Sequence, residues 1–171
     1  YPIRIDLEKL NYASHITKII NDVTDENQNT YKILQLVLNT LYMICQTDKN
    51  LNFILSVFKL RLLCYLGFTP QITQCVCCKE KENLSYFSLK EDGFKCSSCG
   101  RADKGAIQIS ASCKTAIQYI VLADSKKLFS FSLSEENIQE LKQETDKLII
   151  GQHFIYDDNK NLKIFGEDDF E

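Results

Sequence analysis

The chain has 171 residues, of which 44% are hydrophobic and 25% charged, with only 6 Gly and 2 Pro. This composition is typical of a folded globular protein and excludes a disordered or turn-dominated chain. The formal net charge is −3, and basic and acidic residues number 7 and 6 over residues 1–70, 6 and 5 over residues 71–105, and 7 and 12 over residues 106–171. No segment forms a basic stripe, which disfavours tight binding of nucleic acid through charge.

Helical periodicity predicts three helices in the first 70 residues. The first spans about Asp6 to Asn21, and the polar run Asp22–Thr30 follows it as a loop. In the second helix, apolar residues at spacings of 3, 4, 3 and 4 form a stripe on one face: Tyr31, Leu34, Leu38, Leu41 and Cys45. A third helix begins at Leu51 and is apolar around much of its circumference, so we expect it at the centre of a bundle.

The end of the third helix is marked by Gly67, with Pro70 just beyond it. The apolar stretch that contains this helix, Leu51–Phe68, includes Lys59 and Arg61, and it is therefore no membrane span.

The pattern changes after residue 70. Leu84–Leu89 and Phe94–Cys96 are short β-prone runs, and Gly93 at the turn between them predicts a hairpin with a positive φ at that glycine. Two further helices follow. Ser110 or Ser112 begins the first, and the second begins after Ser134 and closes at Gly151.

The predicted fold is therefore mainly α, a helical bundle with an inserted four-cysteine zinc-ribbon β-hairpin. Its parts are the N-terminal helices of the bundle (1–70), the ribbon (71–105), the C-terminal helices that complete the bundle (106–165) and an acidic tail (166–171).

Two C-x-x-C pairs are separated by 17 residues, and they supply four cysteines: Cys75, Cys78, Cys96 and Cys99. Each pair presents two sulfurs on one side of a tight loop, and the hairpin folds the second pair onto the first, so the spacing predicts one structural Zn²⁺ with no open position for water. Four thiolates also suit an iron–sulfur site, and eight cysteines also suit a disulfide scaffold. Each C-x-x-C pair is called a knuckle below. The two knuckles, and a core with ample Leu, Ile and Phe that needs no disulfides, favour a metal site over a disulfide scaffold, and with it a reducing compartment, the cytoplasm.

The remaining four cysteines are not expected to bind the metal. Cys77 lies inside the first knuckle and is treated as a bystander, while Cys45, Cys64 and Cys113 fall in apolar helical contexts and are expected to pack as small hydrophobes. The two histidines have no companion residues, and no phosphate loop or hydrolase motif occurs. We therefore expect no enzyme.

One segment resembles a known family. Phe58–Cys78 closely matches the central stretch of the bacterial recombination mediator family RecO, which reads Phe-x-x-Arg-Leu-Leu-x-x-Leu-Gly-aromatic-x-Pro-x-hydrophobic-x-x-Cys-x-x-Cys. Tyr12–Ser14 resembles the family's first helix beyond its N-terminal domain, and Phe87–Cys96 resembles its ribbon. The resemblance extends to about Phe165. Family members begin with an oligonucleotide-binding barrel, and this chain starts without Met, so we expect a C-terminal fragment that lacks the barrel.

The resemblance implies a non-enzymatic scaffold domain of RecF-pathway DNA repair, in a bacterial, nucleoid-associated protein. The parent would partner with RecR, help RecA load onto strands coated by single-strand-binding protein, anneal complementary strands, and touch single-stranded DNA mainly through the missing barrel. It also implies that the helical domain receives the acidic, Phe-ending tail of single-strand-binding protein. For that tail we predict a site on the third helix at Phe58, Lys59, Arg61 and Tyr65.

Two other hypotheses stay open at this point. An independent zinc-ribbon module that binds nucleic acid needs a basic face, and four thiolates with one Zn²⁺ would give residues 71–105 a net charge of −1. A zinc-dependent deaminase or hydrolase needs a water-bearing metal position, which four cysteines would close.

Overall fold

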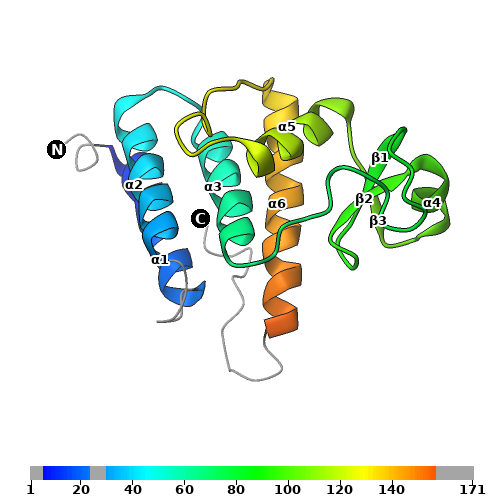
Figure 1. The fold of residues 1–171 in the computed structure, drawn as a ribbon. Coiled ribbons are helices and arrows are strands. Elements are labelled where there is room, and N and C mark those ends of the chain that lie inside the picture. Colours follow the sequence, from blue (N-terminus) through cyan, green and yellow to red (C-terminus); the bar gives the residue numbers. More distant parts are fainter. Residues whose placement is uncertain (1–5, 24–29, 157–171) are drawn as a thin grey trace.

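The computed structural model describes residues 6–23 and 30–156, which form a bundle of helices with a smaller β unit beside it (Figure 1). In chain order the elements are α1 (Leu7–Val23), α2 (Thr30–Gln46), α3 (Leu51–Tyr65), β1 (Leu84–Ser88), β2 (Gly93–Cys96), α4 (Ser97–Ala102), β3 (Ala106–Gln108), α5 (Ala111–Leu122) and α6 (Glu135–Tyr156). The predicted mainly α fold with an inserted hairpin is confirmed. None of the described helices is long and apolar enough to cross a membrane.

Helix α3 lies at the centre of the bundle, as its composition predicts. It packs against α1, α2, α5 and α6, and Figure 1 shows it between α2 and α6. Asn50 caps its start by accepting hydrogen bonds from the N–H groups of Asn52 and Phe53. Ten of its own residues are buried, and they point to all sides of the helix: Phe53, Ile54, Leu55, Ser56, Val57, Phe58, Lys59, Leu60, Leu62 and Leu63.

Helix α3 ends just before Gly67, as predicted. Gly67 adopts a φ of +98°, its N–H donates to the carbonyl of Cys64, and the N–H of Phe68 donates to the carbonyl of Leu63. This pair of bonds is the Schellman motif, in which the residue after the cap takes a left-handed conformation that glycine adopts at little cost. The chain leaves the bundle at this point and enters the β unit.

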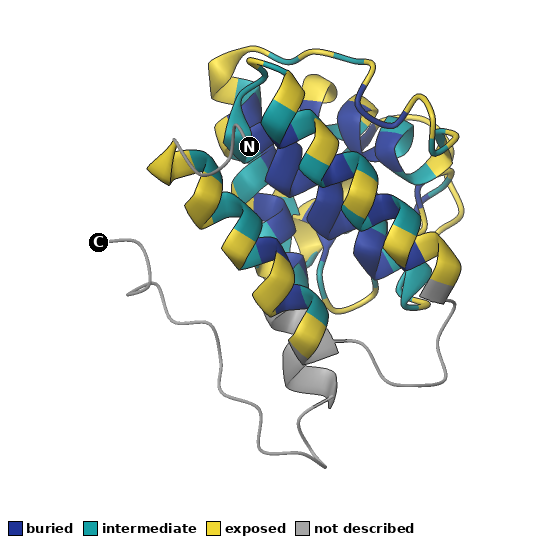
Figure 2. Ribbon diagram, turned by 90° about the vertical axis from the view of Figure 1, so that its left-hand side faces the viewer, coloured by how far each residue is buried: buried dark blue, intermediate teal, exposed yellow. Residues whose placement is uncertain are grey.

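The stripe predicted on α2 faces outward. Tyr31, Leu34 and Leu38 are 74%, 54% and 58% exposed, and Leu41 and Cys45 are only partly buried. A second face of α2 packs into the bundle, through four residues at spacings of 3, 4 and 4: Ile33, Leu36, Thr40 and Ile44. Figure 2 views the molecule from the side on which α1 and α2 lie, and rows of exposed positions run along the helices there.

The β unit is a three-stranded antiparallel sheet in the order β2-β1-β3. The hairpin of β1 and β2 was predicted, whereas β3 and α4 were not, and β3 extends the sheet past residue 105. The predicted positive φ at Gly93 is wrong, because Asp92 takes the left-handed conformation at +49°. Gly93 is needed for space instead, since a Cβ there would lie 2.7 Å from the carbonyl oxygen of Gln71.

The two C-terminal helices begin as predicted, with one choice settled. Ser110, and not Ser112, caps α5 by accepting a hydrogen bond from the N–H of Cys113. The predicted end of α6 at Gly151 is wrong, because the helix continues to Tyr156. The connection 24–29 and the acidic tail 166–171 lie outside the described residues.

Two leucine truncations separate the core of the bundle from the outward stripe. Leu60 has no exposed surface, so Leu60→Ala should lower the free energy of unfolding by about 2–5 kcal/mol through lost burial and the cavity left behind. Leu34→Ala, on the exposed stripe of α2, should change it by less than about 0.5 kcal/mol. Urea unfolding of this chain, followed by far-ultraviolet circular dichroism, measures both. Equal losses would contradict the orientation of α2.

Candidate metal centre

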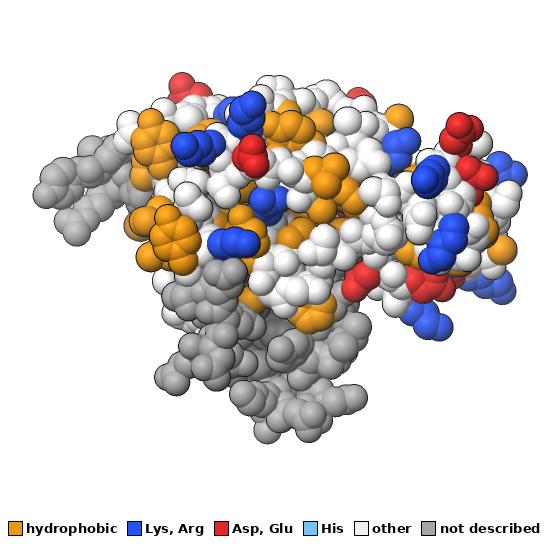
Figure 3. All heavy atoms as spheres, in the orientation of Figure 1, with side chains coloured by type: hydrophobic (Ala, Val, Ile, Leu, Met, Phe, Trp, Pro, Cys, Tyr) orange, Lys and Arg blue, Asp and Glu red, His pale blue; other side chains and the backbone are white. Residues whose placement is uncertain are grey.

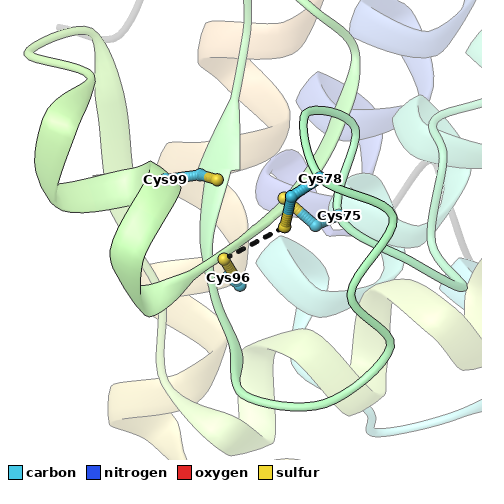
Figure 4. Close-up of side chains that lie close together, drawn as sticks. All are labelled: Cys75, Cys78, Cys96 and Cys99. Atoms are coloured by element: carbon cyan, nitrogen blue, oxygen red, sulfur yellow. Dashed lines mark hydrogen bonds between the residues drawn. The ribbon is translucent and has the colours of Figure 1, made fainter.

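Four cysteines from three elements of the β unit meet at one point. Cys75 and Cys78 lie on the loop before β1, Cys96 is the last residue of β2, and Cys99 lies in the first turn of α4. Figure 4 shows the four side chains converging, with the β hairpin bringing the second pair back to the first. The convergence predicted from the two knuckles is therefore present.

The spacing of the sulfur atoms suits a tetrahedral metal ion. All four Sγ atoms lie within 4.8 Å of one another, and those of Cys78 and Cys96 are 3.7 Å apart. Metal–sulfur bonds of about 2.3 Å at tetrahedral angles place sulfurs about 3.8 Å apart. Across the described residues, no other group of three or more His, Cys, Asp or Glu side chains is spaced to hold a metal ion. The donor set could thus hold one ion and would fill its coordination with protein sulfur.

The backbone around the knuckles favours thiolates at two of the four positions. Burial raises the pKa of the Cys75 thiol, but hydrogen bonds from the backbone N–H groups of Cys78, Cys96 and Cys77 outweigh it and lower that pKa to about 6. The N–H of Cys99, in the first turn of α4, lowers the pKa of the Cys96 thiol. Hydrogen bonds with the sulfurs of Cys96 and Cys78 raise the pKa of Cys99. A metal ion would displace the protons that remain.

The first knuckle is held on the hairpin by backbone hydrogen bonds. The N–H of Gln71 donates to Asp92 at 2.8 Å, the N–H of Phe94 donates to Gln71 at 2.9 Å, and the N–H of Val76 donates to Phe94 at 2.9 Å. Lys79, directly after the knuckle, takes a left-handed φ of +66°. These backbone hydrogen bonds therefore fix the position of the loop that carries Cys75 and Cys78 relative to β2.

A buried lysine supports the second knuckle, and sequence reasoning did not find it. Lys95 is only 3% exposed, and its Nζ lies 2.6 Å from Asp103 Oδ2 and 3.2 Å from Glu91 Oε2. Burial lowers the pKa of Lys95, but the two carboxylates outweigh it and raise that pKa above its ordinary value. The ion pairs tie β2 to the turn between α4 and β3. The spacing of four between Glu91 and Lys95 was the one signal in the sequence.

Three aromatic residues of the β unit are used in its own packing. The rings of Phe87 and Phe94 meet edge to face, with centroids 5.7 Å apart, and both are almost fully buried. The ring of Tyr86 covers Gly100, where an added Cβ would lie 2.2 Å from a ring carbon. Phe87 and Phe94 are therefore core residues of the β unit.

The other cysteines lie outside the cluster. Cys77 is exposed, and its Sγ is 3.4 Å from Glu91 Oε2. Burial raises the pKa of the Cys113 thiol to about 12, and it also raises that of Cys64. All eight cysteines of the chain are free thiols, so the disulfide scaffold is absent. His153 lies in the part of α6 whose side chains are not described.

The four residues predicted to bind a partner tail have partners within the chain. Phe58 has no exposed surface, and Lys59 is 8% exposed and bonded to Asp146 at 2.6 Å. The guanidinium of Arg61 donates to three carbonyls at the end of α5, those of Ile120, Val121 and Ala123, at 2.7–2.9 Å. It also lies 5.1 Å from the ring centroid of Tyr65, whose hydroxyl reaches Ser125 at 3.4 Å. No contact here tests the tail site, which stays a prediction.

The helical bundle and the knuckles both fall within one family model. That model, described as "Recombination protein O C terminal", matches residues 4–152. The chain belongs to the RecO family. Figure 1 shows that the matched range takes in both the bundle and the cysteine-bearing unit.

Individual RecO proteins show the same relationship. The chain is 44% identical over 142 residues to the "DNA repair protein RecO" of Acetivibrio thermocellus, a match that covers 82% of this chain and 57% of that protein. It is 31% identical over 147 residues to that of Thermoanaerobacter sp. (86% and 58%) and 28% identical over 163 residues to that of Halalkalibacterium halodurans (95% and 61%). The chain therefore spans little more than half the length of these relatives.

Substitutions at neighbouring cysteines test the metal centre. Cys99→Ser removes one of the four sulfurs and should abolish or strongly reduce the metal content, which we expect to be about one ion per wild-type chain. Cys77→Ser is the control, because it removes the thiol directly before Cys78, and it should leave the metal content unchanged since that sulfur lies outside the cluster. Elemental analysis of the purified variants measures both contents. A metal-free wild type would refute the site.

Proposed function

We propose that this chain is a non-enzymatic scaffold and partner-binding domain of a RecF-pathway DNA repair and recombination mediator. Membership of the RecO family is the observation that carries the proposal, because the relatives are named DNA repair proteins. The intact protein would bind RecR, help RecA load onto single-stranded DNA coated by single-strand-binding protein, and anneal complementary strands. It would act in the bacterial cytoplasm, at the nucleoid.

The metal we propose is one structural Zn²⁺ held by Cys75, Cys78, Cys96 and Cys99. Four thiolates at these separations leave no position for a water molecule or substrate, so the ion would stabilise the ribbon and take no part in a reaction. An iron–sulfur cluster is the competing occupant of four thiolates. Elemental analysis separates the two, since iron in place of zinc would refute this assignment.

The scaffold role is tested by comparing this chain with the full-length gene product. The full-length protein should accelerate the annealing of complementary strands coated by single-strand-binding protein. It should also co-elute with RecR in size-exclusion chromatography. This chain alone should bind single-stranded DNA weakly, with a shallow dependence on salt, because it has no dense cluster of Lys and Arg. Fluorescence anisotropy at several salt concentrations measures the binding. Tight and steeply salt-dependent binding by the chain would favour the independent zinc-ribbon module.

The site for the acidic, Phe-ending tail remains a proposal at Phe58, Lys59, Arg61 and Tyr65. Because Phe58 is enclosed and Lys59 is paired, Arg61 and the outer edge of Tyr65 are the atoms of this set that a peptide would meet first. Arginine suits a carboxylate, and because three donors of Arg61 are bonded to carbonyls of α5, the tail would have to use the remaining donor of Nη2 or displace one of these bonds.

Calorimetric titration of an acidic Phe-ending peptide tests this site. Wild type should bind in the micromolar range, and Arg61→Ala should bind at least about tenfold more weakly because a charge-assisted hydrogen bond is lost. Arg101→Ala, which removes an exposed arginine of α4, is the control and should bind like wild type. Arg61→Ala also frees three carbonyls, so its thermal unfolding is recorded to confirm that it is folded during titration. Unchanged binding by Arg61→Ala would remove this residue from the site.

A further inference from the structure

The four sulfurs of the metal centre differ in how far solvent reaches them. Cys75 and Cys96 are 0% and 6% exposed and Cys99 is partly buried, whereas Cys78 is exposed. The β unit lies at the right of Figure 3, where Lys, Arg, Asp and Glu side chains gather over it, so this part of the molecule faces water. A small oxidant that diffuses in water therefore meets the sulfur of Cys78 before the other three.

The exposed sulfur has a second cysteine within reach. Its Sγ lies 3.7 Å from that of Cys96, and the dashed line in Figure 4 joins the two. A disulfide needs a separation of about 2.0 Å, so the two sulfurs would have to approach each other by about 1.7 Å. Cys78 and Cys96 belong to different knuckles, so this bond would join the loop before β1 to the end of β2.

The thiols outside the metal centre are less suited to such a bond. Cys113 has no exposed surface, and Cys45 and Cys64 are partly buried in helices of the bundle. Cys77 is exposed, but its Sγ lies 3.4 Å from Glu91 Oε2 and does not belong to the group of four close sulfurs. The pair across the two knuckles is therefore the one that combines access with proximity.

We propose that Cys78 and Cys96 are a peroxide-sensitive switch, which releases the metal ion when the two cysteines form a disulfide. The inference rests on the proposed structural Zn²⁺ site and deepens it. A cysteine that binds a metal is a thiolate, which is the form that reacts with a peroxide. Loss of two of the four sulfurs would leave two protein ligands, fewer than a structural zinc site needs.

The reaction balances with one molecule of hydrogen peroxide. The Cys78 thiolate attacks one peroxide oxygen, the O–O bond breaks, and hydroxide leaves, so that a sulfenic acid forms. The Cys96 thiolate then attacks that sulfur, the S–S bond forms, and the S–O bond breaks with loss of a second hydroxide. The two sulfurs supply the two electrons that reduce the peroxide, and each hydroxide takes a proton from the solvent.

Release of the ion would loosen one part of the β unit. Helix α4 has six residues, too few to be stable alone, and Cys99 in its first turn ties it to the first knuckle through the metal. A disulfide between Cys78 and Cys96 removes that tie. The ion pair of Lys59 and Asp146, which closes the bundle, involves no residue of the β unit, so the bundle would stay folded.

Hydrogen peroxide added to the reduced, zinc-loaded chain tests the switch. We expect the release of about one metal ion per chain, which a colorimetric chelator measures. Tryptic peptides 62–79 and 96–101 should become joined by a disulfide, and fragmentation in mass spectrometry should place it at Cys78 and Cys96. A thiol reductant with added Zn²⁺ should then restore the metal content. Hydrogen exchange of the oxidised chain should be at least about tenfold faster in α4 and unchanged in α3.

Cys77→Ser is the matched control. It removes the neighbouring exposed thiol and keeps all four ligands, so it should release the metal and form the same disulfide to the same extent as wild type. Retention of the metal, its release without a disulfide at Cys78 and Cys96, or unchanged exchange in α4 would overturn the switch and leave the zinc site standing. The metal content is measured before peroxide is added, because an untreated chain without zinc would refute the site and the switch together.

Discussion

The enclosure of α3 is the constraint on which the rest of the bundle depends. A helix surrounded by protein can hold a cation only where its neighbours supply a partner, because burying an unpaired charge is costly. Lys59 finds Asp146 on α6, and Arg61 finds the three carbonyls that end α5. Both partners lie far along the chain, on helices that follow the β unit. The two cations therefore fix how the C-terminal helices close around α3.

The same contacts explain how the β unit is inserted without disrupting the bundle. Asn50 caps α3 with its side-chain oxygen and donates its amide to Glu135 at 3.0 Å, which joins the starts of α3 and α6. The chain leaves at Gly67 and returns at Ser110, whose N–H donates to Glu140 of α6 at 2.7 Å. Both the exit and the return are thus attached to elements of the bundle, and the residues between them fold as a separate antiparallel sheet.

The β unit itself has few means of stability. Its buried apolar side chains are few, namely Ile72, Leu84, Phe87, Phe94 and Ile109, and they join the ion pairs of Lys95 in holding it. Units this small generally gain further stability from a metal or disulfides. Four converging thiols would supply that stability by holding a metal ion, because their sulfur separations approach those of a tetrahedral site.

The sequence alone determined the features that depend on local spacing. The C-x-x-C pairs, the hairpin between them and the end of α3 at Gly67 are set by neighbouring residues, and all appear where predicted. Tertiary structure decided which side of α2 is buried, because both sides are apolar and periodicity cannot rank Ile33 against Leu34. It also decided the partner of Arg61, since carbonyls left over at the end of a helix some 60 residues later leave no mark in the sequence. Charge pairs and helix faces of this kind are settled by packing between distant elements, which spacing along the chain does not record.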